Sequence, residues 1–588
     1  MSEQRPWLRV TTLIAVVALV AAACGVQGTP AAGTPTTGPT ATTPGETPEP
    51  FAGDSWEAGC NNYPETTPGE LDYVKAVDRY TVEFGLCYLD VAFLSKIAFT
   101  SFAILDKDYL DETKGTGTAL EAPNGTGPYM VNAGDWVRGD HITFTKFDNF
   151  WDTANAAKEG TVIFRWNAEA AARLTELQSP EGVDGIDNPG ATDFDVIRND
   201  PSLQLFERQA INIFYVGMTN TFAPFGNEKV RQAIAQGIDR QRIVDKFYPP
   251  GSEVASHFSP CVLLGGCEGP AWYDFDATAA KTLLAEGLQE EVTAGNLTEA
   301  TFPDTEIFYR DVVRGYLPTP PLVAADIQDQ LATNLGITAK VTPMDSGAFI
   351  TAANKGELNG FYLLGWGADY PDMTNFVDVH FGASNPQFGN PFFDLAGQMR
   401  LGGSLNDDGQ RKLIYADVNR LIKEHVPMVP IAHGGSGAAY KAAVQGAYAA
   451  PLTDERFAVM SNGTGTIKWM QNAEPLSLFC GDESDGESLR ACEQVYEPLY
   501  TYETGGTAPI PALAESCTAS ADNLKWTCTL RQGVTFHNGA AFDANDVVAT
   551  YAALMDGNNP NHGGHDQTWY YQGAFFGSLL NPPPAPVE

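Results

Sequence analysis

The stretch that most constrains the fold of this chain lies near its C-terminal end, between residues 492 and 548. Residues 523–531, NLKWTCTLR, alternate apolar and polar side chains, which is typical of a half-buried strand. Gly533 and the Asn538-Gly539 pair predict turns after this strand. Asp543 then stands where the N-cap of a following helix is expected. The stretch therefore predicts a strand, turns and a capped helix in close succession.

This stretch resembles the opening of the family 5 extracellular solute-binding proteins, the peptide-binding components of ABC importers. A VYE-L helix, an LA-S turn, an LR-GV-FH-G hairpin and a DA-DVV helix start follow one another in that family. The same motifs stand here in the same order. Residues 124–152, 214–240 and 273–284 resemble later parts of the family. The family's opening is thus found where its end is expected.

The order of the family is therefore rotated in this chain. Residues 463–588 resemble its first quarter, residues 51–460 resemble the remainder, and neither part is duplicated. One interpretation is a circular permutation within one fold, which succeeds because the termini of a domain often lie close together at its surface. Residues 461–465, SNGTG, would then be a flexible linker, and the new ends would meet away from the ligand. The other interpretation is a tandem array whose second copy is truncated.

The resemblance implies an α/β fold of the two-lobe periplasmic-binding-protein type (class II), with an extra subdomain in the first lobe and a hinge between the lobes. It implies a first-lobe peripheral subdomain at 51–129, first lobe at 130–228, second lobe at 229–434, a first-lobe return segment at 435–460, the linker at 461–465, and first lobe with its subdomain at 466–588.

The N-terminal residues predict export. Arg5 and Arg9 precede an apolar run of about fourteen residues, shorter than the ~20 that a membrane span needs. Residues 1–23 are therefore expected to be a signal peptide. Small residues before Cys24 resemble a bacterial lipobox, in which Cys24 becomes the lipidated first residue; a non-lipidated signal is the alternative. Residues 24–50 are rich in Thr and Pro and read as a tether.

The charge and the cysteines agree with export. A formal net charge of −38 argues against nucleic acid or anionic lipid as a partner and suits a soluble monomer. Of nine cysteines, Cys24 leaves an even number, which exported proteins usually pair. No zinc motif occurs, and no metal or other cofactor is expected. Short-range pairing predicts the disulfides Cys60–Cys87, Cys261–Cys267, Cys480–Cys492 and Cys517–Cys528.

The best binding candidate is the segment 361–372, FYLLGWGADYPD. An apolar strand ends in a Gly-Trp-Gly turn, and a buried carboxylate beyond it would need a partner such as a ligand ammonium. In peptide-binding family members, the aspartate of a matching GW–ADY stretch pairs with the ligand's α-amino group. The resemblance thus implies Asp369 as the amine anchor, with Trp366 and Tyr370 beside it. A surface turn is the alternative, and Asp372 suits a helix cap.

Other aromatic residues are candidates for the cavity wall, since aromatic rings give a large apolar contact. Ordinary core packing is the alternative for each. An arginine that precedes the GW pair in some peptide binders is missing here, because Leu363 and Leu364 occupy that neighbourhood. The length and kind of ligand therefore stay open. The wall candidates are Tyr129, Trp469 and Phe479.

The implied function is capture of di- or oligopeptides outside the membrane and delivery to a permease driven by a separate ATPase, with the protein lipid-anchored on the outer face of the cytoplasmic membrane or in the periplasm. A nickel complex, glutathione or an oligosaccharide as ligand, and a sensor lipoprotein without transport, remain open. A binding protein is expected rather than an enzyme. His433 and Ser436 lack a GxSxG elbow, which leaves a hydrolase as a weaker alternative. Residues 562–566, HGGHD, lack a second metal-binding cluster.

Overall fold

A computed structural model describes residues 51–63, 69–310, 312–382, 387–389, 392–565 and 567–577. The predicted signal peptide, Cys24 and the tether lie outside this range. Three sheets of five or more strands organise the described residues. None of the described helices is both long and apolar enough to cross a membrane.

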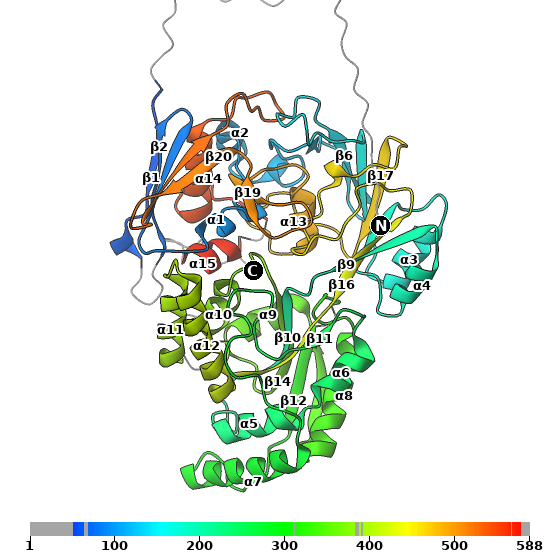
Figure 1. Cartoon of the computed structure of the whole chain (residues 1–588), viewed down its shortest axis with the longest axis vertical. Helices are drawn as coiled ribbons and strands as arrows, with labels where there is room; N and C mark the ends of the chain where they lie inside the picture. The colour runs from blue at the N-terminus through cyan, green and yellow to red at the C-terminus, as the bar shows by residue number, and fades with distance from the viewer. Residues whose placement is uncertain are drawn as a thin grey trace, which may run out of the picture. The chain divides into compact units, whose positions relative to one another are not determined.

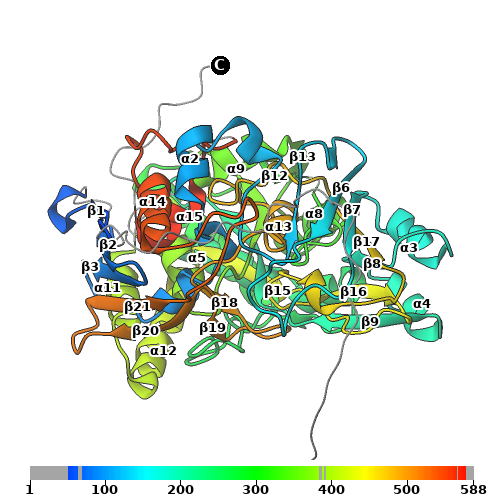
Figure 2. The ribbon, with the colours of Figure 1, turned by 90° about the horizontal axis from the view of Figure 1, so that it is seen from above.

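The peripheral subdomain is built on a five-stranded sheet from both ends of the chain. Figures 1 and 2 show the C-terminal strands, in orange, beside the N-terminal strands, in blue. β3 pairs antiparallel with β21, which joins the two parts into one sheet. Helices α1 (Phe93–Lys96), α2 (Lys107–Thr113), α14 (Ala544–Met555) and α15 (Tyr570–Phe576) belong to the same part of the fold. The strand order is β1 (Ser55–Glu57), β2 (Leu71–Asp78), β3 (Thr81–Leu86), β21 (Lys525–Leu530) and β20 (Ala514–Ala519).

The first lobe proper has an eight-stranded sheet with a C-terminal strand at its centre. β17 lies between β7 and β8 and is parallel to both. Helices α3 (Ala170–Gln178), α4 (Asp193–Asn199) and α13 (Gly486–Cys492) accompany this sheet. The order is β4 (Tyr129–Met130), β6 (His141–Lys146), β7 (Thr161–Trp166), β17 (Thr466–Gln471), β8 (Gly185–Asp187), β16 (Ser436–Lys441) and β9 (Leu203–Arg208), with β5 (Trp136–Val137) paired to β6. A separate hairpin joins β18 (Tyr500–Tyr502) to β19 (Pro509–Pro511).

The second lobe is built on a six-stranded sheet. Its central strands are buried along most of their length, which suits continuous apolar runs rather than alternation. The order is β11 (Glu253–Val254), β15 (Met428–His433), β10 (Asn212–Met218), β14 (Phe361–Gly367), β12 (Thr305–Arg310) and β13 (Ala339–Met344). Its helices are α5 (Glu228–Gly237), α6 (Arg240–Phe247), α7 (Ala277–Ala294), α8 (Pro320–Gln330), α9 (Ser346–Asn354), α10 (Thr374–Phe381), α11 (Phe393–Gly403) and α12 (Asp408–His425).

The chain crosses between the lobes twice, after β9 and after β15. Asn212 ties the crossings together: its side chain donates to the Gly434 carbonyl and accepts from the Gly434 amide, both at 2.7 Å. Only glycine fits at 434, because a Cβ there would lie 2.2 Å from the Gly315 carbonyl oxygen. The predicted boundary between the lobes at residue 228 is wrong, because β10, which ends at Met218, already belongs to the six-stranded sheet of the second lobe. The amphipathic pattern of α5 suggested the later boundary.

Residues after 463 pack into the same sheets and core as the N-terminal part of the chain. One hydrophobic core contains side chains from Trp56 to Phe164 and from Ala438 to Phe576. The structure contradicts two details of the sequence analysis. The VYE-L segment follows α13 instead of forming a helix. The C-terminal helix α15 lies beside the cavity described below, so this end of the chain is not remote from it.

The 461–465 segment is held in place and is not the flexible linker expected. The Glu159 carboxylate accepts hydrogen bonds from the Ser461 hydroxyl at 2.5 Å and from the amides of Asn462, Gly463 and Gly465 at 3.0, 2.8 and 2.7 Å. Burial opposes ionisation of Glu159, but these hydrogen bonds outweigh it and hold the pKa below its ordinary value. A buried carboxylate thus fixes the loop that joins the two parts of the chain.

Candidate functional site

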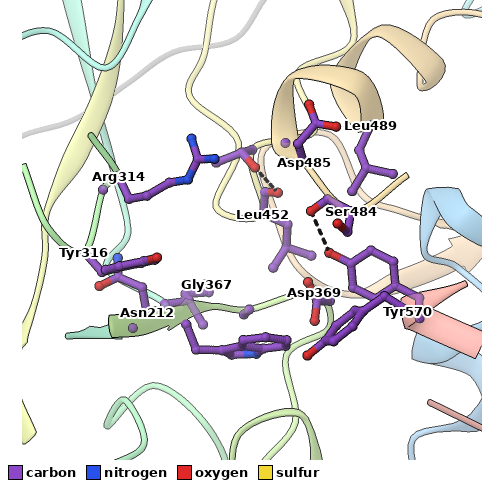
Figure 3. Close-up of a pocket in the computed structure, with 18 of the residues that line it drawn as sticks. Asn212, Arg314, Tyr316, Gly367, Asp369, Leu452, Ser484, Asp485, Leu489 and Tyr570 are labelled. Atoms are coloured by element: carbon purple, nitrogen blue, oxygen red, sulfur yellow. Dashed lines mark hydrogen bonds between the residues drawn. The ribbon is translucent and has the colours of Figure 1, made fainter. Parts of the chain in front are cut away.

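A cavity of about 900 Å³ lies between the two lobes. Its volume is that of a site for a small molecule or a short chain of residues. The second lobe supplies residues from the ends of β10, β12 and β14 and from α10. The first lobe supplies residues around β16, the loop before β17, α13 and α15. Figure 3 shows side chains from both lobes pointing into this space.

Asp369 stands just beyond the end of β14, and its side chain faces the cavity (Figure 3). It is only 8% exposed. The Asn375 amide donates to its carboxylate at 2.9 Å, and the Asp369 backbone amide donates back to Asn375 at 2.9 Å. Burial raises the pKa of Asp369 to about 7, although hydrogen bonds from Asn375 and Tyr571 act in the opposite direction. Among the described residues, Asp369 forms no salt bridge.

Aromatic rings flank this carboxylate. The Trp366 ring, also lining the cavity, lies 6.0 Å from the Tyr570 ring, centroid to centroid. Trp366 donates through its indole nitrogen to the Asn375 side-chain oxygen at 3.1 Å. Asn375 therefore orients both the carboxylate and the indole. An ammonium placed here would meet one negative charge and the faces of aromatic rings, both of which attract cations.

Arginines lie elsewhere along the cavity. Arg310, at the end of β12, donates to the Ser346 hydroxyl at 3.1 Å and to the Tyr316 hydroxyl at 3.2 Å. Arg314 reaches across to the first lobe, where it lies 3.5 Å from the carboxylate of Glu487. In Figure 3, Arg314 and Tyr316 lie on the opposite side of the view from Asp369 and Tyr570. The cavity thus has an acidic, aromatic side and a side that carries guanidinium groups.

A buried ion network forms part of the first-lobe wall. Arg208 pairs with Asp187 at 3.0 Å and with Glu455; Arg490 pairs with the same two carboxylates at 2.9 and 2.7 Å. Burial opposes ionisation of Glu455, but the two guanidinium groups outweigh it and lower its pKa to about 2. The network is internally neutral, so these arginines leave no surplus charge for a ligand.

The structure separates the predicted cavity residues into two groups. Asp369 and Trp366 line the cavity. The other four aromatic residues predicted to line the cavity do not line it, because their rings pack in the first-lobe core. Tyr370 contacts Phe575 at 4.8 Å between centroids and thereby joins the lobes. The three remaining residues, each at most 1% exposed, are Tyr129, Trp469 and Phe479.

The helix cap predicted at Asp543 and the predicted disulfides are present, whereas Asp372 lies one residue before the N-cap of α10, which is Met373. Asp372 accepts from the amide of Thr374 at 3.0 Å and pairs with Arg411 at 2.7 Å. Asp543 forms a capping box with Asp546 at the start of α14. The disulfides are Cys60–Cys87, Cys261–Cys267, Cys480–Cys492 and Cys517–Cys528.

The weaker chemical candidates are occupied by structural contacts. His433 lies in β15, where its Nδ1 contacts the Asn212 carbonyl at 2.5 Å. Ser436 accepts a hydrogen bond from Arg208 at 3.2 Å. His562 stacks on Trp569 with 4.0 Å between ring centroids. Asp566 of the same motif lies outside the described residues. Among the described residues, Cys60, Asp72 and Cys87 lie close enough together to share a metal ion, but the two cysteines are disulfide-bonded to each other.

Several residues that line the cavity or support Asp369 carry no local signal in the sequence. Asn375 lies inside a helix, and Arg314 lies in an irregular segment after β12. Tyr570 is far from the GW segment along the chain. The only available signal was its aromatic neighbourhood, since Trp569, Tyr570 and Tyr571 stand together. Tertiary packing alone brings Arg314 and Tyr570 to the cavity.

The family model for bacterial extracellular solute-binding proteins, family 5 (middle) matches residues 35–388 and 508–574, which is more than half of the chain. Di/tripeptide-binding protein 1 of Pseudomonas aeruginosa is 28% identical over 368 residues, 61% of this chain and 65% of that protein, which is just under two thirds of its length. Dipeptide-binding protein of Escherichia coli is 25% identical over 431 residues, 69% of this chain and 77% of that protein.

A solved structure, HbpA2 from Haemophilus parasuis, is similar with a TM-score of 0.53 and 26% identity, over 67% of this chain and 76% of that one. The two-lobe α/β architecture of the described residues agrees with this likeness. The chain therefore belongs to the bacterial extracellular solute-binding proteins of family 5, which bind solutes and are not enzymes.

Proposed function

We propose that this protein captures di- or oligopeptides in the cavity between its lobes. The observation that carries the proposal is Asp369, a carboxylate nine-tenths buried at the cavity wall and without a salt bridge among the described residues. Leaving a charge desolvated and unpaired is costly, and a ligand ammonium would supply the missing partner. The names of the two peptide-binding relatives support the same ligand class.

The guanidinium groups support a direction for the bound peptide. With the α-amino group at Asp369, the rest of the ligand would extend toward Arg310 and Arg314. A guanidinium group binds a carboxylate through charge-assisted, often paired hydrogen bonds. In this proposal Arg310 takes over from the missing arginine before the GW pair and receives the ligand's carboxylate.

The proposed cycle uses the two crossings between the lobes as a hinge. Ligand contacts on both lobes would favour the closed form, which a membrane permease with a separate ATPase would recognise. Arg314 and Glu487 already form a contact between the lobes. We further propose that the mature chain acts as a monomer and is held at the membrane by lipid on Cys24, with residues 24–50 as a tether.

We also propose that the rotated order of the family is a circular permutation. The pairing of β17 with β7 and β8, and of β21 with β3, supports this reading, because each sheet then needs both parts of the chain. The family match in two separate parts of the chain agrees with it. An alignment that keeps one chain order spans only 61–69% of this chain in the two relatives, as expected for a rotated sequence.

The test is calorimetric titration of residues 25–588, prepared with disulfides intact, with defined di-, tri- and tetrapeptides. Each peptide is paired with its N-acetylated form, which lacks the ammonium. We expect the free-amine peptides to bind and acetylation to weaken binding at least tenfold. An Asp369→Asn variant should lose this discrimination. Asp245→Asn, an exposed change on α6, serves as the control for charge.

Binding of acetylated and free peptides with equal affinity would contradict the amine anchor. Absence of binding to every peptide, in a protein that unfolds cooperatively, would contradict the peptide assignment. Glutathione, nickel complexes and oligosaccharides are then the next ligands to titrate. A protein that binds peptides, in cells that do not take these peptides up although they express a permease encoded beside it, would favour a sensor role.

A further inference from the structure

The charges that line the cavity do not balance. Arg208 and Arg490 are matched by Asp187 and Glu455, and Arg314 faces Glu487. Among the described lining residues, Arg310 is then the only remaining arginine or lysine, and burial lowers the pKa of His380 to about 4. The remaining acidic lining residues are Asp369, Asp378, Asp454 and Asp485. One amine anchor therefore accounts for only one of these four carboxyl groups.

Asp454 is the most distinctive of these carboxylates. It lies in the first-lobe loop before β17, lines the cavity and is partly exposed there. Among the described residues, its side chain forms no salt bridge, and it accepts a hydrogen bond from its own backbone amide. The nearby guanidinium of Arg456 is engaged elsewhere, because it donates to Glu493 at 2.7 Å and to the Tyr502 carbonyl at 2.8 Å. Burial raises the pKa of Asp454 to about 7, and the charge of Arg456 opposes this shift without forming a salt bridge to it. Asp454 is thus a carboxyl group at the cavity wall whose charge a ligand cation would stabilise.

Tyr502 relates Asp454 to the amine anchor. Its hydroxyl lies 3.4 Å from the Asp369 carbonyl oxygen and donates to the Ser95 carbonyl at 2.7 Å. Burial raises the pKa of Tyr502 well above its ordinary value, and the charges of Asp454 and Asp369 both add to this shift. Asp369 comes from the second lobe and Asp454 from the first lobe, and both line the same cavity.

We propose that Asp454 makes the cavity selective for peptides that carry a lysine or arginine side chain near the N-terminus. The α-amino group pairs with Asp369 of the second lobe, and the basic side chain pairs with Asp454 of the first lobe. A doubly cationic ligand thereby connects the lobes through two opposite-charge contacts and favours closure. This inference rests on the proposed peptide function and names the substrate class for it.

The test compares peptides that differ by one charge. Lysine and norleucine share the same aliphatic chain, so Lys-Leu-Ala and norleucine-Leu-Ala differ only in the side-chain ammonium; Ala-Lys-Ala and Ala-norleucine-Ala form a second pair. We expect the wild-type protein to bind the better lysine peptide of the two pairs about tenfold more tightly than its norleucine partner. In Asp454→Asn the ratio should fall to near one, with the norleucine affinity unchanged. Asp245→Asn, far from the cavity, should keep the wild-type ratio.

Each outcome has a definite meaning. Equal affinity of the wild-type protein for lysine and norleucine peptides would overturn the charge preference while leaving peptide capture intact. A preference that persists in Asp454→Asn would overturn the role of Asp454. Failure of all four peptides to bind would remove this inference together with the proposed function. A cooperative thermal unfolding transition of the ligand-free variant shows that Asp454→Asn folds.

Discussion

Asn375 joins two groups of the cavity through one side-chain amide. Its oxygen accepts from the Trp366 indole and from the Asp369 backbone, while its nitrogen donates to the Asp369 carboxylate. The aspartate and the tryptophan are therefore positioned together. Loss of this one side chain frees the indole and removes a hydrogen bond that favours the ionised carboxylate.

We predict that Asn375→Ala weakens binding of a free-amine peptide by roughly tenfold, in line with ~1–1.5 kcal/mol for a lost hydrogen-bond network. The pKa of Asp369 should rise further, since its hydrogen bond from Asn375 is gone. Calorimetry measures the affinity, and NMR titration measures the pKa. Asn296→Ala, on the second-lobe surface, is the matched control. An unchanged affinity would show that Asn375 does not position the anchor.

A second prediction concerns pH. The pKa of Asp369 is raised to about 7 from an ordinary value of 3.8, so the folded, ligand-free protein holds a proton that the unfolded chain loses. Its contribution to stability is full below the unfolded pKa and is lost as pH rises through about 7. Peptide affinity should change in the opposite sense and fall as pH drops from 7 to 5, because the ammonium needs the ionised carboxylate.

The measurement is thermal unfolding of wild type and Asp369→Asn between pH 5 and 8 without ligand. The variant should be the more stable protein at pH 8, and its advantage should shrink toward pH 5. A stability difference between the variant and the wild type that stays the same from pH 5 to 8 would contradict a raised pKa at this residue.

The sequence located the residues that follow one strand and failed for residues that packing decides. Asp369 and Trp366 could be predicted because the end of an apolar strand and a family motif coincide at these residues. Trp469 and Tyr129 are also on strands, yet their side chains face the core, and alternation in a short strand does not identify the face that a ligand meets. Arg314 and Tyr570 reach the cavity only through the tertiary fold.

At the scale of elements, the loop 461–465 is stabilised by a single carboxylate. Glu159 accepts hydrogen bonds from the Ser461 hydroxyl and from three backbone amides of this loop. A glutamine at 159 would point its NH₂ group at some of these donors. We predict that Glu159→Gln lowers the free energy of unfolding by about 1–3 kcal/mol, the cost of leaving buried donors unsatisfied. Urea denaturation measures this loss. Glu299→Gln, on an exposed part of the second lobe, should unfold like the wild type, and an equal result for Glu159→Gln would contradict the proposed role.

The elements themselves were largely predictable, and their partners were not. The capped helix α14 and the strand β21 follow from local periodicity and capping residues. The lobe boundary failed because the helix α5 has a clear amphipathic pattern, whereas β10, the buried strand before it, has no polar alternation to mark its sheet. The pairing of β17 with β7 is a contact between distant residues that no local pattern encodes.

At the scale of the whole molecule, the structure makes residues 463–577 part of the first lobe. We predict that residues 51–460 alone do not unfold cooperatively. Without β17 the strands β7 and β8 lose their common neighbour, and without β21 the strand β3 is exposed at an edge. Circular dichroism and thermal scans measure this. A cooperative transition in that fragment would favour the tandem interpretation.

We also predict that the family order can be restored. A chain that runs from residue 463 to 577, continues through a Gly/Ser linker to residue 51 and ends at 460 should fold and bind the same peptides. Linker length has a small effect on stability, since closure entropy grows slowly with length. Unchanged affinity with intact disulfides would support permutation; a chain that fails to fold with linkers of several lengths would contradict it.

The position of α15 in chain order has a consequence for biosynthesis. Every described strand precedes Tyr570 and Tyr571, so the ribosome delivers all of the sheets before it delivers these two residues of the cavity wall. A nascent chain thus acquires its scaffold first and its ligand contacts later. Proteolytic trimming from the C-terminal side would reverse that sequence, removing ligand capture from molecules that still hold every strand.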